Sequence, residues 1–256
     1  MTGDEMLGGG DAEQETEVRR ARIARELIAV VRRLPPAEVP DALCRACMGL
    51  LPVVSGMSMS MSMTGNGYET GVVLCASDEV AARLAELQYT LGEGPCMEAV
   101  RLRAPVFATD LTRAPDSRRW PLFSVQATRA GAEAVFSVPL GGARGALGTL
   151  DLYRAAAGSL DGDHVRTALL VADAVTLAVA TLDHAPVYPD GVVSWLEGAE
   201  SDREEVHQAT GIVMVHLGVS AEEALLRLRA RAFAEGRTST EVARAIIDHT
   251  MDIRSD

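Results

Sequence analysis

Three hydroxyl–glutamate pairs near the C-terminus place the strongest constraint on the fold. They are Ser201-x-x-Glu204, Ser220-x-x-Glu223 and Thr238-x-x-Glu241. In such a capping box, the hydroxyl and the carboxylate bond to backbone amides that the start of a helix leaves unpaired. Gly218 and Gly236 stand where the first two helices should end. The pattern predicts three short helices, at about 202–217, 221–235 and 239–252.

A second stretch, MSMSMSM at residues 57–63, is incompatible with a helix. Its strict alternation puts the methionines on one face of a strand and the serines on the other. Methionine fills irregular gaps in a core well, so we expect the methionine face to pack against helices. Two alternatives stay open: the methionines line a ligand pocket, or the serines face a polar pocket.

Residues 37–183 read as a mixed segment of helices and strands. The turn residues Gly65-Asn66-Gly67 and the glycine-rich 141–145 separate neighbouring strands. No long crossover helix divides the last two strands, which predicts an antiparallel sheet and an α+β fold. The expected strands are 57–63, 70–76, 105–108, 134–140 and 146–153, and the expected helices are 37–51, 78–88, 120–129 and 163–182.

Two helices carry apolar residues at heptad spacing. The first is expected over 13–34, ending at Pro35-Pro36, and the second over 163–182. Such seams suggest a helical-bundle homodimer through Ile23–Leu34 and Val165–Leu182. The alternative is that each seam packs on its own domain. The seam residues are Ile23, Leu27, Val30 and Leu34, and Val165, Ala168, Ala172, Val175, Val179 and Leu182.

Composition limits the class of protein and its surroundings. The 256 residues include 24 arginines and no lysine, and the net charge of −12 provides no overall basic footprint for nucleic acid. No membrane-length apolar run or signal-peptide core is present, so a cytoplasmic protein is expected. A disulfide is not expected in that compartment. Cys44 and Cys47 could begin a metal or redox site, but their spacing favours helix packing.

Five segments follow from these patterns. Residues 1–12 form an acidic, glycine-rich tail expected to be disordered, and 184–200 form a proline- and glycine-containing linker. The remaining segments are the helix at 13–35, the mixed domain at 36–183 and the three-helix module at 201–256.

The middle helix of the C-terminal module carries a row of charges opposite its buried stripe. Glu223, Arg227 and Arg231 are spaced i,i+4, and Arg229 lies at the edge of the buried side. Such a row is commonly only a solvated face, but it can also contact phosphates. Phe233 is expected in the core.

The stretch from Val206 to Asp248 resembles an ANTAR domain, the RNA-binding antitermination module of bacterial regulators. The motif Gln208-Ala209-x-Gly211, the spacing to Leu228-Arg229, and Val242-Ala243 carry the resemblance. The family often has a basic residue where this chain has Thr210. The resemblance implies an RNA-binding surface that comprises Gln208, Thr210, Gly211, Arg227, Arg229, Arg231, Arg237 and Arg244.

The preceding segment resembles the GAF domain that stands before ANTAR in actinobacterial regulators. LGEGPCMEA at 91–99, RRWPLF at 118–123 and the stretch 137–154 carry this resemblance. It implies an antiparallel sheet flanked by helices, with a small-molecule pocket on one face. We expect that pocket among Met57, Met59, Met61, Met63, Cys96, Trp120 and Phe123. No histidine precedes His164, so haem held by a proximal histidine within the sheet is not expected, and no cofactor is predicted.

Together the two resemblances imply a signal-responsive, non-enzymatic regulator. Such proteins act as dimers on tandem hairpins in leader transcripts and favour antitermination. The alternative is a protein-interaction or DNA-binding transcriptional regulator that uses the same helices. No paired carboxylates, catalytic triad, metal motif or phosphate loop indicates an enzyme.

Overall fold

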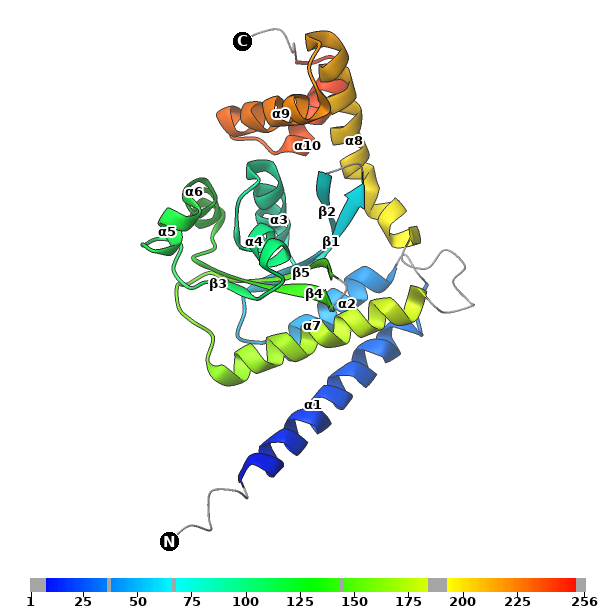
Figure 1. Cartoon of the computed structure of the whole chain (residues 1–256), viewed down its shortest axis with the longest axis vertical. Helices are drawn as coiled ribbons and strands as arrows, with labels where there is room; N and C mark the ends of the chain where they lie inside the picture. Colours follow the sequence, from blue (N-terminus) through cyan, green and yellow to red (C-terminus); the bar gives the residue numbers. More distant parts are fainter. Residues whose placement is uncertain (1–7, 36–37, 66–67, 143–144, 184–192, 252–256) are drawn as a thin grey trace.

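A five-stranded antiparallel sheet forms the centre of the protein. The computed structural model describes residues 8–35, 38–65, 68–142, 145–183 and 193–251. The strand order is β2-β1-β5-β4-β3, and all neighbours are antiparallel, as the sequence predicts (Figure 1). The strands are β1 (Gly56–Gly65), β2 (Tyr68–Ala76), β3 (Val106–Ala108), β4 (Ala134–Gly142) and β5 (Gly145–Arg154).

Three helices enclose the larger core. They are α1 (Gly8–Val31), α2 (Val39–Leu50) and α7 (Gly162–Asp183). α2 and α7 cover one face of the sheet, and α1 packs against these two helices (Figure 1). Met57 and Met59 are fully buried in this core, and Met61 is 8% exposed. The prediction that the methionines pack against helices is therefore confirmed for these three; the side chain of Met63 lies outside the described residues.

The opposite face of the sheet is covered by shorter helices and holds a second core. These helices are α3 (Glu79–Leu91), α4 (Pro95–Leu102), α5 (Asp116–Arg119) and α6 (Pro121–Ala130). Asp78 caps α3 as expected, because its carboxylate accepts from the amide of Ala81 at 2.9 Å. Trp120 and Phe123 are buried here. The expected elements did not include α4 and α5.

Both heptad seams pack inside the chain. Ile23 and Leu27 on α1 and Ala168, Ala172 and Val175 on α7 are at most 2% exposed within the core. The two helices lie against each other and are linked by a hydrogen bond from Arg19 to Thr167 of 2.7 Å. A single chain therefore already buries much of both seams, as the alternative predicts, although Val30, Leu34 and Val165 are only partly buried and the side chain of Leu182 lies outside the described residues. Pairing of two copies through Ile23–Leu34 and Val165–Leu182 stays a prediction.

The cysteines differ from expectation in one respect. Cys44 on α2 forms a disulfide with Cys75 on β2, at a Cα–Cα distance of 6.4 Å, which corrects the expectation that no disulfide forms. The helix and the strand bring two residues together that are far apart in sequence, which spacing alone does not reveal. Cys47 is buried, as the packing interpretation predicts, and burial raises the pKa of its thiol to about 12.

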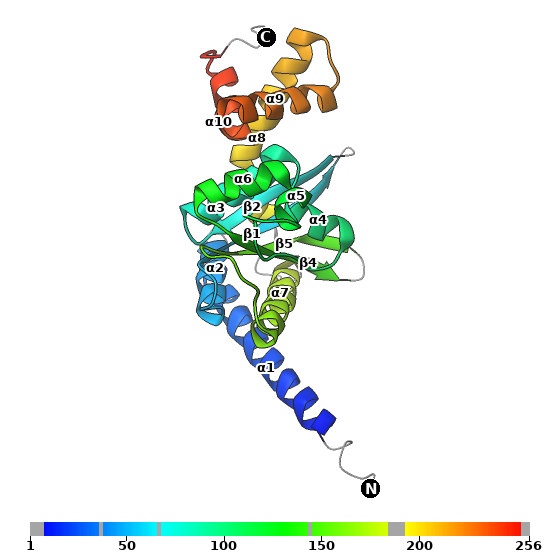
Figure 2. The ribbon, with the colours of Figure 1, turned by 90° about the vertical axis from the view of Figure 1, so that its left-hand side faces the viewer.

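The C-terminal module consists of three helices at the opposite end of the molecule from α1 (Figures 1 and 2). They are α8 (Val193–Leu217), α9 (Ala221–Glu235) and α10 (Ser239–Ile247). Thr238 and Glu241 form a complete capping box, and the Ser220 hydroxyl accepts from the amide of Glu223. Gly236 ends α9 in a left-handed conformation, with φ +67°.

The first helix of the module begins earlier than predicted. α8 starts at Val193, so Ser201 lies inside a helix and part of the predicted linker is helical. Gly198 is the strongest helix-weakening residue between these points, at about 1 kcal/mol, and the helix runs through it, so the cap signal at Ser201 is overridden. Likewise α1 begins at Gly8, within the segment predicted to be disordered. Residues 1–7, the turn centre 66–67, residues 143–144 and the linker part 184–192 lie outside the described residues.

Candidate functional site

The predicted arginine row lies on the outer face of α9 and is paired with acids. Arg227 Nη2 lies 2.6 Å from Glu223 Oε1, and both side chains are half-exposed. Arg231 pairs in the same way with Glu235, one turn further on. The hydrogen bond from Arg231, followed by that from Arg237, holds the pKa of Glu235 below its usual range. Exposed pairs of this kind contribute only about 0–1 kcal/mol, so a phosphate can replace the glutamates.

The two remaining outer arginines join elements of the module. Arg237 Nη2 donates to the backbone oxygen of Glu241 at 2.6 Å. Arg244 Nε on α10 lies 2.6 Å from Glu205 Oε2 on α8. The structure thus places these arginines on one compact module but gives each an acidic or carbonyl partner. Any RNA surface formed here is a row of exchangeable ion pairs and not a uniformly basic patch.

The predicted residues on α8 fall into separate environments. Gln208 is exposed, while the Thr210 hydroxyl donates to the backbone oxygen of Val206 at 2.7 Å. A Cβ atom added to Gly211 meets nothing within 4 Å. Gly211 therefore leaves room for a partner from outside this chain to approach the helix closely.

Phe233 is not a core residue. It is 42% exposed on α9, which corrects the expectation from the sequence. Leu226 and Phe233 are two turns apart, so they share a face of the helix that Leu228 and Ala232 do not occupy. The exposed ring gives the module an aromatic surface, which is the feature that single-stranded RNA bases stack on.

Arg229 is separated from the other arginines. Its guanidinium carbon lies 4.9 Å from the ring centroid of Tyr89, which belongs to α3 in the first domain. Its Nε atom is buried. The position at the edge of the buried side was predicted, but the partner that buries it was not.

The residues predicted to share a small-molecule pocket do not come together. Met57, Met59 and Met61 lie in the core on one side of the sheet, while Trp120 and Phe123 lie in the core on the other. Cys96 is half-buried at the start of α4, where its amide donates to Gln88 Oε1 at 2.7 Å. The sheet separates the two groups, because the three methionines all point to one face of it, whereas Trp120 and Phe123 come from the helical segment at α5 and α6 on the other face.

The serine face of β1 instead forms part of a buried polar floor beneath α3. Ser58 on β1 and Ser137 on β4 both pair in register with Asp151 on β5, and all three are at most 6% exposed. Gln88 of α3 closes the site from above at 0% exposure. Asp151 Oδ1, Ser137 Oγ and Gln88 Nε2 are buried without a hydrogen-bond partner. These atoms line or border a cavity of about 10 Å³, which is room for a single water molecule.

Burial strongly perturbs the acid in this floor. Loss of hydration raises the pKa of Asp151 to about 6, and the hydrogen bond from the Thr149 hydroxyl only partly opposes the rise. Thr149 Oγ1 donates to Asp151 Oδ2 at 3.0 Å. Of the serines in the alternating stretch, Ser58 lines this cavity, Ser60 is half-buried, and the side chain of Ser62 lies outside the described residues. The sequence analysis did not predict Asp151 or Gln88 as site residues. A single acid within the apolar strand LDLYR was a signal that could have identified Asp151, whereas nothing in the sequence distinguishes Gln88 from other polar helix residues.

The architecture defines a sensory-type domain followed by a helical regulatory module. A GAF domain profile matches residues 34–180, and an ANTAR domain profile matches residues 196–247. The chain therefore belongs to the GAF family and carries an ANTAR domain behind it, which makes it a GAF–ANTAR regulator. No curated protein matches it in sequence.

Three solved structures illustrate what this chain is similar to. Two are GAF domains of phosphoenolpyruvate-protein phosphotransferases, from Acinetobacter (10% identity, 64% of this chain and 95% of that chain, TM-score 0.46) and Coxiella burnetii (14%, 64% and 94%, 0.46). The third is the type II free methionine-R-sulfoxide reductase of Thermoplasma acidophilum (15%, 57% and 96%, 0.41).

Two further properties concern only the described ranges. No single helix there is long and apolar enough to cross a membrane. Two helical segments within α8 and α9 have the required length and composition only when they are taken together, and the chain bends by 108° between them. No three His, Cys, Asp or Glu side chains in the same ranges gather in a way that could hold a metal ion.

Proposed function

We propose that the protein is an RNA-binding regulator that promotes antitermination by binding tandem hairpins in nascent transcripts, under the control of its GAF domain. The observation that carries the proposal is the outward arginine row of α9, on a module in which side-chain caps fix the starts of α9 and α10. The net charge of −12 argues against binding by overall attraction to duplex DNA. The short ion pairs with Glu223 and Glu235 support a modest, salt-sensitive contact with phosphates.

We expect the double variant Arg227→Ala/Arg231→Ala to bind a two-hairpin RNA about tenfold more weakly than the wild type. The salt dependence should also become shallower by one to two units, because about two phosphate contacts are lost. Fluorescence anisotropy across several salt concentrations measures both quantities. A single-hairpin RNA and a DNA duplex serve as comparison probes.

The matched control for this variant is Arg101→Ala/Arg118→Ala, which removes two exposed arginines from the GAF domain. It loses the same charge and should leave RNA binding nearly unchanged. If both variants lose RNA affinity equally, the effect of Arg227→Ala/Arg231→Ala is one of net charge and not of a specific phosphate contact. Stronger binding to the duplex than to the RNA would support the DNA-binding alternative.

We also expect Phe233→Ala to weaken hairpin binding by about tenfold while leaving the salt dependence unchanged. Stacking of a base on an aromatic ring contributes about 1–3 kcal/mol and involves no phosphate. Leu226→Ala is the control, since it removes another exposed apolar side chain from the same face of α9. Phe233→Trp should retain binding. A loss of affinity that is as large in Leu226→Ala would exclude a stacking role.

We propose that the protein acts as a homodimer through helices α1 and α7. The exposed apolar side chains of α1 and α7 include Val18 at 63% and Leu177 at 51%. Burial of such side chains favours association. The molar mass in solution, from light scattering, tests whether two chains associate and whether Leu177→Ser separates them.

A further inference from the structure

Helix α3 contacts both domains. One side of it contributes Ala81, Leu84 and Gln88 to the cavity above the polar floor. The other side carries Arg83, Glu86, Tyr89 and Thr90, which contact the C-terminal module. One rigid helix therefore connects the interior of the GAF domain to the ANTAR module.

Tyr89 is the centre of the contact between α3 and the module. It is 6% exposed and packs with the module's own core residues, among them Val206 and Leu228. Arg229 stacks on its ring, and a Cβ atom on Gly92 would lie 3.6 Å from Arg229 Nη1. Gly92 caps the C-terminus of α3, where the helix dipole favours a cation. Arg229 is thus held by α3 and does not face outward with the rest of the row.

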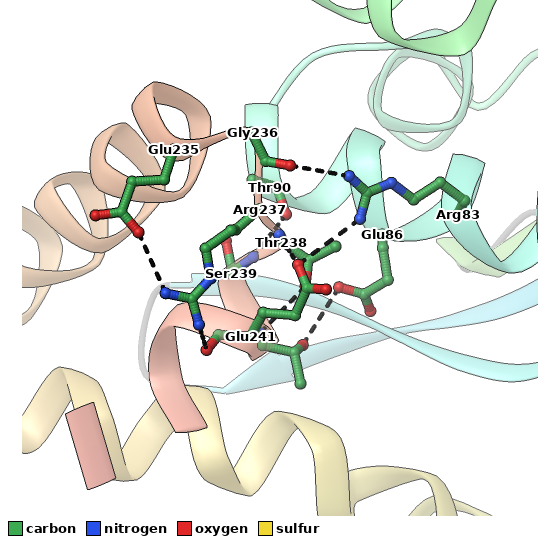
Figure 3. A network of polar contacts seen from close by, with 10 residues as sticks. Arg83, Glu86, Thr90, Glu235, Gly236, Arg237, Thr238, Ser239 and Glu241 are labelled. Atoms are coloured by element: carbon green, nitrogen blue, oxygen red, sulfur yellow. Dashed lines mark hydrogen bonds and ion pairs between the residues drawn. The ribbon is translucent and has the colours of Figure 1, made fainter. Parts of the chain in front are cut away.

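The start of α10 is held by the same end of α3 (Figure 3). The amide of Ser239 donates to Thr90 Oγ1 at 3.1 Å, and the Thr240 hydroxyl donates to Glu86 Oε2 at 3.3 Å. Arg83 lies at the rim, donating to the backbone oxygen of Gly236 at 3.4 Å and approaching Glu241 at 3.8 Å. Thr90 and Ser239 are buried by this contact, whereas Arg83 and Glu241 are partly exposed.

The rim of the contact is held by weak polar interactions. It consists of long hydrogen bonds and one partly exposed ion pair, all of which water can replace. Tyr89 is the aromatic anchor of the contact among the described residues. The caps of α9 and α10 are made by residues of the module itself, namely Ser220, Thr238 and Glu241. The module can therefore leave α3 without losing its own helix starts.

We propose that α3 is an autoinhibitory clamp that withholds Arg229 and the start of α10 from RNA, so that the module must leave α3 before it binds fully. This inference rests on the proposed function, because it assumes that Arg229 belongs to the RNA surface. In the docked state Tyr89 occupies the guanidinium face on which an RNA base would otherwise stack.

The cavity beneath α3 provides the means of release. Gln88 faces the cavity, and the next residue, Tyr89, faces the module. The cavity holds no more than one water, so any larger molecule that bonds to Asp151 or Gln88 Nε2 must displace α3. Occupation of the cavity and docking of the module then oppose each other, which is a coupling between two sites.

The test compares RNA binding by full-length variants in the anisotropy assay. We expect Tyr89→Ala to bind the two-hairpin RNA at least about fivefold more tightly than the wild type. Thr240→Val should shift affinity in the same direction by less, because it removes one rim hydrogen bond and preserves shape. Glu79→Ala, at the exposed start of α3, is the control and should have no effect.

A cross-link tests the reverse direction. Thr90→Cys/Ser239→Cys replaces residues that are already hydrogen-bonded across the contact. The oxidised variant should bind RNA at least about tenfold more weakly than its reduced form. The wild type under the same reductant controls for reduction of Cys44–Cys75.

The outcomes separate the clamp from the proposed function. If the wild type binds RNA and neither Tyr89→Ala nor the cross-link changes affinity, the clamp is overturned and RNA binding stands. If no form binds RNA, the proposed function fails. Amide hydrogen exchange at residues 237–241 then shows whether α3 holds the start of α10 in solution. Tyr89→Ala must accelerate that exchange; unchanged exchange overturns the clamp as well.

Discussion

Replacing Gly148 by alanine is expected to lower the free energy of unfolding by about 3 kcal/mol or more, or to prevent folding. Gly148 on β5 faces Met61 on β1 in the sheet register. A Cβ atom there would lie 1.9 Å from the backbone oxygen of Ser60 and 2.8 Å from the Cα of Met61. Backbone cannot rotate away as a side chain can, so the two central strands would have to separate. Urea unfolding monitored by circular dichroism measures the change.

Gly49→Ala is the matched control for this substitution. Gly49 lies in α2, and an added Cβ meets nothing within 4 Å. Alanine there should be neutral or stabilising by about 0.5–1 kcal/mol, because it favours the helix. Equal stability of the Gly148→Ala variant and the wild type would show that β1 and β5 do not approach as closely as described.

The second large effect is a pH dependence that arises from Asp151. Its pKa in the folded protein is about 6, above the ordinary value of 3.8. The folded state therefore holds a proton that the unfolded state has released between these pH values. Stability from this group is complete below about pH 4 and is lost as the pH rises through 6. The loss amounts to about 3 kcal/mol by pH 7, since each pKa unit corresponds to about 1.4 kcal/mol.

Asp151→Asn should remove this slope. Its unfolding free energy, relative to the wild type, should rise by about 3 kcal/mol between pH 4 and pH 7. A constant offset from altered hydrogen bonds does not affect the slope, so urea titrations at several pH values isolate the ionisation. Asp173→Asn removes an exposed carboxylate on α7 and controls for net charge. If the difference in unfolding free energy between Asp151→Asn and the wild type does not change with pH, then burial does not raise the pKa of Asp151.

Local patterns in the sequence predicted most of the elements. The strand at 57–63, the cap at Asp78 and the capping box at Thr238 each depend on neighbours a few residues away, and the structure contains all three. The predicted start of α8 was wrong, although it rested on the same kind of local signal. A capping signal at Ser201 is local, but the helix-forming residues before it decide whether a helix begins there.

The parts that failed depend on contacts between distant segments. Cys44 and Cys75 meet because α2 lies against β2. The heptad seams contact each other within one chain, and periodicity cannot distinguish this from pairing between two chains, which stays a prediction. Tyr89 and Arg229 are 140 positions apart, so no spacing rule connects them. The candidate RNA arginines were found because they share one helix, whereas the polar floor is assembled from three strands and a helix.

The polar character of the contact between α3 and α10 has a consequence for its temperature response. Exposure of apolar surface raises the heat capacity of a protein, and exposure of polar surface lowers it. The contact combines the ring of Tyr89 with hydroxyl, carboxylate and guanidinium groups, so these contributions largely cancel when it opens. The enthalpy of opening is then nearly independent of temperature. The ratio of docked to released molecules should follow a straight van't Hoff line, over a range in which the unfolding equilibrium of the same chain is strongly curved.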